Sequence, residues 1–171
     1  MVSVFRENIF RFILLILFQV LILDHVELGG YLNPFLYVMF ILMLPFETPD
    51  WLVLLLGFIT GLTLDMFTDT IGMHTASCVW LAYLRKYILR LVAPRDGYET
   101  AFRPTFRQMG FSWFLAYASI LVFAHHFMLF FLEIFRLSDF FFTFFKVILS
   151  SAFTLLLIFI TQFLLYAPRE R

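Results

Sequence analysis

The residues whose types could do chemistry gather in one short stretch of this chain. Asp65, Asp69 and His74 lie close together in the sequence. A carboxylate and an imidazole within hydrogen-bonding reach can act as a general acid–base pair. Ser77 and Cys78 follow about one helical turn after His74, and neither lies obviously beside the pair. An intramembrane enzyme that uses the three residues is therefore only an alternative. We expect His74 to lock the loop structurally, by a hydrogen bond to Asp65 or Asp69.

Two glycines lie in register with this carboxylate. Gly57 and Gly61 precede Asp65 at intervals of four residues, so one face of a helix would carry all three. Small residues at this spacing let two membrane helices approach closely. The pattern predicts either a helix-packing seam that ends in a solvated charge, or a surface that contacts a partner protein. Gly72 and His74, in the turn that follows, belong to the same candidate site.

A second histidine pair invites a metal-binding interpretation. His125 and His126 are adjacent, and adjacent helical residues point about 100° apart, so the two cannot easily share one ion. We expect them to be polar anchors at a membrane interface. The sequence also contains no P-loop, no nucleophile elbow, no zinc-protease motif and no dinucleotide fingerprint. We therefore expect no metal, no cofactor and no enzymatic activity.

The elements that position these residues must be membrane helices. Sixty-three per cent of the residues are apolar and 26 of 171 are Phe, and the mean hydropathy is +0.94. A bilayer accepts that much apolar surface, provided that every backbone polar group is paired within the protein. The net charge is zero and gives no sign of nucleic-acid binding. The sequence predicts an all-α integral membrane protein with a single transmembrane domain.

Charged and turn-forming residues divide the chain into six apolar segments. A spanning helix needs about 20 residues, and two of the segments are shorter. The shortest lies between Pro34 and Pro45, so it and the next segment could instead form a re-entrant hairpin. We expect six crossings and keep the hairpin open as the alternative. The predicted helices cover residues 9–24, 34–46, 50–66, 72–92, 109–132 and 140–166.

Lysines and arginines predict the orientation of these helices. With six crossings and the N-terminus inside, ten of them fall in inner positions, and only Arg136 and Lys146 fall outside. Cytoplasmic loops retain positive charge, so both termini should be cytoplasmic, and Lys146 should snorkel outward. Six of the inner cations form a patch that either faces anionic lipid or docks a cytoplasmic protein: Arg85, Lys86, Arg90, Arg95, Arg103 and Arg107.

The motif residues give the chain a family likeness. The residues that carry it are Gly57, the run Gly61-Leu62-Thr63-Leu64-Asp65 and, after a short loop, Gly72-Met73-His74. The chain length, the six segments, the two inner termini and an acidic first outer loop with Asn33-Pro34 agree with it. On these features the chain resembles the MreD family of rod shape-determining proteins of bacterial inner membranes. The likeness covers essentially the whole chain.

The resemblance implies a function and a fold. It implies a non-catalytic scaffold of the cell-elongation, peptidoglycan-synthesising machinery in the bacterial cytoplasmic membrane. The partners would be membrane lipids and a bitopic MreC-like protein, together with MreB, RodA and a penicillin-binding transpeptidase. It also implies a fold similar to the substrate-binding subunits of energy-coupling-factor transporters. The alternative is a vitamin-capturing transporter subunit, with an outward-facing pocket under residues 24–34 and with Asp65 and His74 at its wall.

Overall fold

The computed structural model describes residues 2–25, 33–98, 103–134 and 140–165. The structure is all-helical, with 80% helix and no strand in those ranges. Five helices are long, and the others are one or two turns each. In chain order the elements are α1 (Val2–Leu21), the 3-10 turn η1 (Leu23–His25), α2 (Val38–Leu42), α3 (Asp50–Thr68), α4 (Met73–Leu91), α5 (Phe106–Met109), α6 (Phe111–Ile134) and α7 (Phe140–Leu165).

Four stretches are long and apolar enough to cross a membrane, and they lie in α1–η1, α3, α6 and α7. The chain is therefore compatible with a multi-pass membrane protein. The fifth long helix, α4, is not among the four, and it carries three cations in its C-terminal half, Arg85, Lys86 and Arg90. Such a helix needs protein around its polar face.

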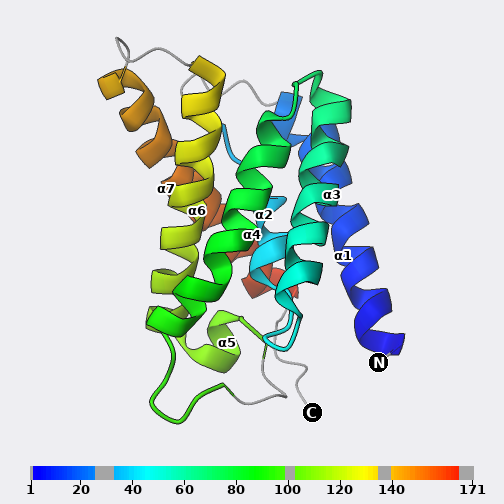
Figure 1. Ribbon diagram of the computed structural model, residues 1–171, viewed down its shortest axis with the longest axis vertical. Coiled ribbons are helices and arrows are strands. Elements are labelled where there is room, and N and C mark those ends of the chain that lie inside the picture. Colours follow the sequence, from blue (N-terminus) through cyan, green and yellow to red (C-terminus); the bar gives the residue numbers. More distant parts are fainter. Residues whose placement is uncertain (1, 26–32, 99–102, 135–139, 166–171) are drawn as a thin grey trace.

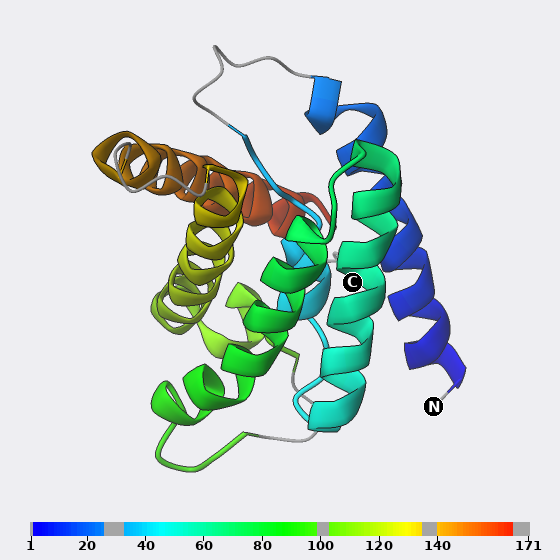
Figure 2. The same ribbon diagram turned by 45° about the horizontal axis from the view of Figure 1, so that its top comes forward.

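The long helices stand side by side, and α4 packs between α3 and α6 (Figure 1). The next helix, α7, lies against α6, and α1 lies at the opposite edge beside α3. In the turned view of Figure 2, α7 crosses behind the others while α1 remains at the edge. Only a small part of the α1 surface is buried inside the protein. The bundle thus leaves most of the α1 surface exposed.

Two ends of the bundle differ in charge. The first turns of α1, the end of α4, and α5 lie together at one end (Figure 1). The arginines of the described ranges belong to these elements and to the loop that follows α4. We call this end of the bundle the basic end. The α3–α4 turn and the turn η1 lie at the opposite end, with Asp24, Asp65 and Asp69. The chain reverses tightly there, because Asp69 (φ 52°) and Gly72 (φ 74°) both adopt the left-handed conformation.

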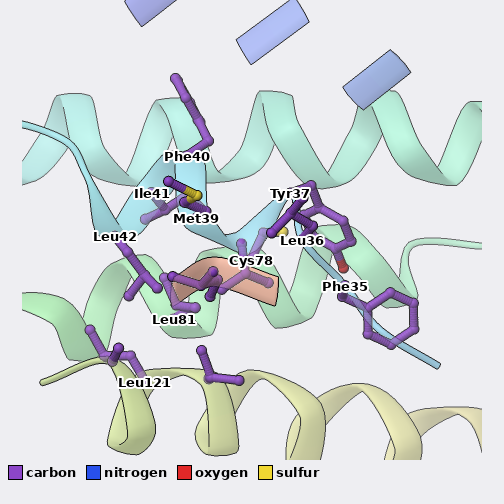
Figure 3. Packing of buried hydrophobic residues seen from close by; sticks show 14 of the residues in the cluster. Phe35, Leu36, Tyr37, Met39, Phe40, Ile41, Leu42, Cys78, Leu81 and Leu121 are labelled. Atoms are coloured by element: carbon purple, nitrogen blue, oxygen red, sulfur yellow. The ribbon is translucent and has the colours of Figure 1, made fainter. Parts of the chain in front are cut away.

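The most unexpected element is residues 33–45, which we call the central segment. A helix over 34–46 was expected, but only Val38–Leu42 is helical. The remainder is extended or turned and lies between the long helices, as Figure 3 shows. Every residue from Leu36 to Leu44 is at most 4% exposed. Its apolar side chains are therefore buried against protein and do not face lipid.

Side chains of the surrounding helices pair the backbone of the central segment. The Gln19 side chain of α1 donates to the Pro34 carbonyl (3.0 Å) and accepts from the Leu36 amide (2.9 Å). The Thr154 hydroxyl of α7 accepts from the Phe35 amide at 3.0 Å. Backbone groups outside a helix are stable at membrane depth only when protein partners supply their hydrogen bonds. The central segment meets that requirement through helices on both sides of it.

This arrangement changes the expected count of helices. The described residues hold five long helices and a central segment that runs the length of the bundle with one short helix. It contacts Gln19 near the end opposite the basic end and Arg85 towards the basic end. The other expected helices agree with the structure within a few residues, except that α1 begins at Val2.

Candidate functional site

The two glycines of the motif form a seam inside the chain. They lie buried on the face of α3 that packs against α4. A Cβ atom on Gly57 would lie 2.9 Å from the Ala82 Cβ and 3.0 Å from the Cys78 carbonyl oxygen. A Cβ on Gly61 would overlap the backbone of Thr75. The close approach that the spacing predicts is thus made between α3 and α4 of one molecule.

Asp65 continues this seam and caps the next helix. One carboxylate oxygen accepts from the His74 amide (3.0 Å) and the other from the Thr75 amide (2.9 Å). The Thr70 and Thr75 hydroxyls donate to the same carboxylate. Amide groups at a helix start have no partner within the helix, and a carboxylate there also interacts favourably with the helix dipole. Asp65 is 7% exposed, so the expected solvated charge is a buried structural one.

We expect Asp65→Asn to lower the unfolding midpoint of the purified protein. The substitution turns one acceptor oxygen into an NH₂ group, which would face a donor at Thr75 or His74. A buried donor left without its acceptor costs about 1–3 kcal/mol. Thermal unfolding in detergent measures the effect.

Asp69→Asn is the matched control. Asp69 is exposed at the end of α3, and asparagine tolerates its left-handed backbone. The same loss of charge there should leave the midpoint unchanged. Equal midpoints for the two variants would show that the Asp65 hydrogen bonds do not stabilise the start of α4.

The His74 side chain does not reach Asp65 or Asp69, contrary to the expected lock. Its Nδ1 atom is 2.8 Å from the Tyr37 hydroxyl, and that hydroxyl is 3.0 Å from Nε2 of His125. Only the His74 amide bonds Asp65. The imidazole therefore ties α4 to the central segment and, through Tyr37, to α6. Gly72 lies outside this cluster, is exposed, and has open space around its α-carbon.

His125 and His126 are fully buried, so the expected interfacial location is wrong. His126 Nδ1 lies 2.9 Å from the Val122 carbonyl oxygen, and its Nε2 lies 3.0 Å from the Thr154 hydroxyl. The physical reason is that α7 and the central segment bring polar partners to them in the interior. In the described ranges, no three His, Cys, Asp or Glu side chains are placed to hold a metal ion.

Arg85 lies in the interior and does not belong to a surface patch. It is 3% exposed, and its Nε donates to the Tyr117 hydroxyl at 3.1 Å. One terminal nitrogen donates to the carbonyls of Leu44 and Pro45. The Tyr117 hydroxyl donates in turn to the Leu42 carbonyl at 3.0 Å. Arg85 and Tyr117 therefore pair the backbone of the central segment at its Leu42–Pro45 end. Gln19 and Thr154 pair it at the Pro34–Leu36 end.

The other five cations of the expected patch do lie at the basic end. Lys86 pairs with Asp50 at 3.6 Å, and Arg103 pairs with Glu7 at 2.8 Å. The remaining three, Arg90, Arg95 and Arg107, are exposed.

Lys146 also differs from its expected role. It is 8% exposed, because Glu133 binds its ammonium group at 3.5 Å and the Phe130 ring lies beneath it. It therefore packs against α6 and does not snorkel outward. Arg136, expected at the same end, lies outside the described residues.

Sequence reasoning missed the polar groups that meet the central segment. Gln19, Tyr37 and Tyr117 stand alone in apolar runs and show no pattern. The last helix does carry a signal, because its buried polar residues recur every three or four positions along one face, a spacing typical of an interior stripe. These are Thr143, Lys146, Ser150 and Thr154.

Comparisons with known proteins do not assign the chain to a family. No family model, no curated protein and no solved structure matches it. The residues and their geometry therefore carry the functional argument.

Proposed function

We propose that this chain is a non-catalytic scaffold of the MreD type in the bacterial cytoplasmic membrane. It binds a bitopic MreC-like protein and acts with MreB, RodA and a penicillin-binding transpeptidase in cell elongation. The central segment counts as the second of six crossings, in a fold similar to the substrate-binding subunits of energy-coupling-factor transporters. The support is the resemblance of the Gly57–His74 motif, together with the structural use that the molecule makes of those residues.

One observation favours a scaffold over the alternatives: the polar side chains in the interior bind the protein's own backbone. The polar side chains of α1, α4, α6 and α7 converge on the backbone of the central segment. The centre of the bundle is filled by the buried side chains of residues 36–44. Asp65 and His74, the suggested pocket wall, hold α4 and Tyr37 instead. This use of polar groups favours a rigid body that presents its outer faces to partners.

The distribution of charge supports the proposed orientation. The basic end carries at least seven cations in the described ranges, whereas the opposite end carries Lys146, which is paired with Glu133. Loops rich in lysine and arginine stay in the cytoplasm. We therefore place the basic end, with the start of α1 and the end of α7, on the cytoplasmic side.

The exposed face of α4 is the surface best suited to a membrane partner. Trp80, Tyr83 and Tyr87 lie along it, each about two-fifths exposed. Tyrosine and tryptophan favour the membrane interfaces, yet Trp80 follows Met73 by seven residues, about 10 Å into the helix. A polar aromatic stripe that extends so deep suits a protein neighbour better than lipid tails. We assign this stripe to the transmembrane helix of the MreC-like partner.

Co-purification tests the assignment. Tagged protein is co-expressed with the MreC-like partner, and the recovered partner is quantified for wild type and for the double variant Trp80→Leu/Tyr83→Leu. Large aromatic side chains dominate interface energies, so we expect recovery to fall about tenfold. The double variant Phe141→Leu/Phe145→Leu, which changes two exposed rings of α7, should recover the partner normally.

Two results would contradict the proposal. If the wild-type chain recovers no partner, the scaffold function is wrong. If both double variants recover the partner equally, the function stands and the α4 face is wrong. Substitution of Gly61 cannot make this distinction, since that residue lies in the seam between α3 and α4.

A further inference from the structure

A cavity of about 310 Å³ lies at the basic end, between the start of α3 and the end of α4. Three cations line it, Arg85, Lys86 and Arg90, together with one carboxylate, Asp50. The remaining wall is largely apolar, with Tyr98 at one side. The cavity therefore combines an excess of positive charge with a space large enough for a group of several heavy atoms.

Arg85 brings a charge that no carboxylate compensates in the described part of the chain. Its guanidinium donates to the Tyr117 hydroxyl and to the carbonyls of Leu44 and Pro45, which are neutral acceptors. Hydrogen bonds to neutral acceptors only partly offset the free energy lost when a charge is removed from water. An anion in the cavity would lower that cost.

The other two cations are available to such an anion. Lys86 binds Asp50 at 3.6 Å, and both side chains are partly exposed, so this pair is weak and easily rearranged. Arg90 makes no hydrogen bond and no ion pair within the described ranges. Burial raises the pKa of the Tyr98 hydroxyl, which donates to the Leu89 carbonyl at 2.6 Å. Tyr98 therefore stays neutral and adds no competing negative charge.

We propose that this cavity binds the phosphate group of an anionic phospholipid. Guanidinium and ammonium donors match phosphate oxygens in charge and geometry. The apolar wall, which includes Val53, Ala82 and Leu89, suits the glycerol and the first methylenes of a lipid better than a free ion. In the orientation proposed above, on which this inference rests, the cavity at the end of α4 lies on the side of the cytoplasmic leaflet, which is rich in anionic lipid.

Binding there has a structural consequence for the bundle. The phosphate would bind three cations of α4, and one of them, Arg85, also holds the end of the central segment. The lipid would therefore stabilise the basic end, because a ligand that binds only the folded state raises its stability.

Lipid retention by the full chain tests the proposal. Purified protein is placed in nanodiscs of phosphatidylcholine with or without phosphatidylglycerol, and the bound lipid is measured by native mass spectrometry after release. We expect selective retention of phosphatidylglycerol and a higher unfolding midpoint in its presence. Arg90→Gln and Lys86→Gln should each weaken retention about fivefold, since each removes one charge-assisted contact.

Arg107→Gln is the matched control, because Arg107 is an exposed cation at the same end and does not line the cavity. It should retain the lipid as wild type does. An equal loss of lipid retention in Arg107→Gln and Arg90→Gln would show that the cations attract lipid to the surface in general and not to this cavity, and would overturn the proposal. Equal retention of the two lipids would also overturn it. Inorganic phosphate that displaces the lipid and protects equally well would show a free anion to be the ligand instead.

Discussion

Gly61→Leu should leave little folded protein in detergent, the largest effect that we expect of any single substitution in this chain. Even a methyl group at this position would overlap the Thr75 backbone and lie 2.6 Å from the His74 carbonyl oxygen. Backbone atoms cannot move aside as a flexible side chain can, so α3 and α4 would have to separate. Overpacking of a rigid core costs about 1–3 kcal/mol for a small group, and leucine should exceed that range. Size-exclusion profiles and thermal unfolding measure the loss.

Two further variants make this prediction specific. Gly57→Ala should be milder than Gly61→Ala, because its nearest neighbour is the Ala82 methyl group at 2.9 Å and not a backbone atom. Met66→Leu, at a residue of the same helix that is 75% exposed, should have no effect. A monodisperse Gly61→Leu protein with a wild-type midpoint would show that the tight contact between α3 and α4 does not exist.

Arg85→Met should produce the second large effect. Methionine keeps much of the side-chain volume but removes the donors to Tyr117, Leu44 and Pro45. Buried acceptors without donors, and the loss of hydrogen bonds to a charged group, should cost about 3 kcal/mol. The end of the central segment should then loosen, so amide hydrogen exchange of residues 43–48 should become faster than in wild type.

Arg90→Met is the matched control for this change. It removes the same charge from the same helix, at an exposed residue without a hydrogen bond in the described part of the chain. We expect wild-type exchange and, in detergent without added anionic lipid, a wild-type midpoint. If Arg85→Met also exchanges like wild type, then the guanidinium does not hold the central segment in place.

The sequence was sufficient to predict most of the long helices. The starts and ends of α3, α4, α6 and α7 follow from apolar runs bounded by turn residues, and each lies within a few residues of its expected position. It was not sufficient for the central segment. Hydropathy measures how apolar a run is, and it cannot tell whether lipid or protein surrounds that run. Residues 34–46 are apolar enough for either, and only the surrounding polar partners decide.

The same limit explains the errors at polar residues. His125, Arg85 and Lys146 were expected to seek an interface or water, as isolated polar side chains do. Each is buried because a partner from a distant part of the chain meets it: Tyr37, Leu44 and Glu133, respectively. Asp65 was placed correctly on the glycine face, because the spacing of four is local. Its hydrogen bonds could not be foreseen, because they depend on how the turn at Gly72 folds.

The pairing of the central segment has a consequence for biosynthesis. The Phe35 amide bonds the Thr154 hydroxyl, 119 residues later in the chain, and the Asn33 amide bonds Ser150. When the ribosome delivers this segment to the membrane, the helix that completes its hydrogen bonds has not yet been synthesised. The segment therefore cannot complete these hydrogen bonds before α7 has been made, and assembly of the bundle can finish only after that helix is in place.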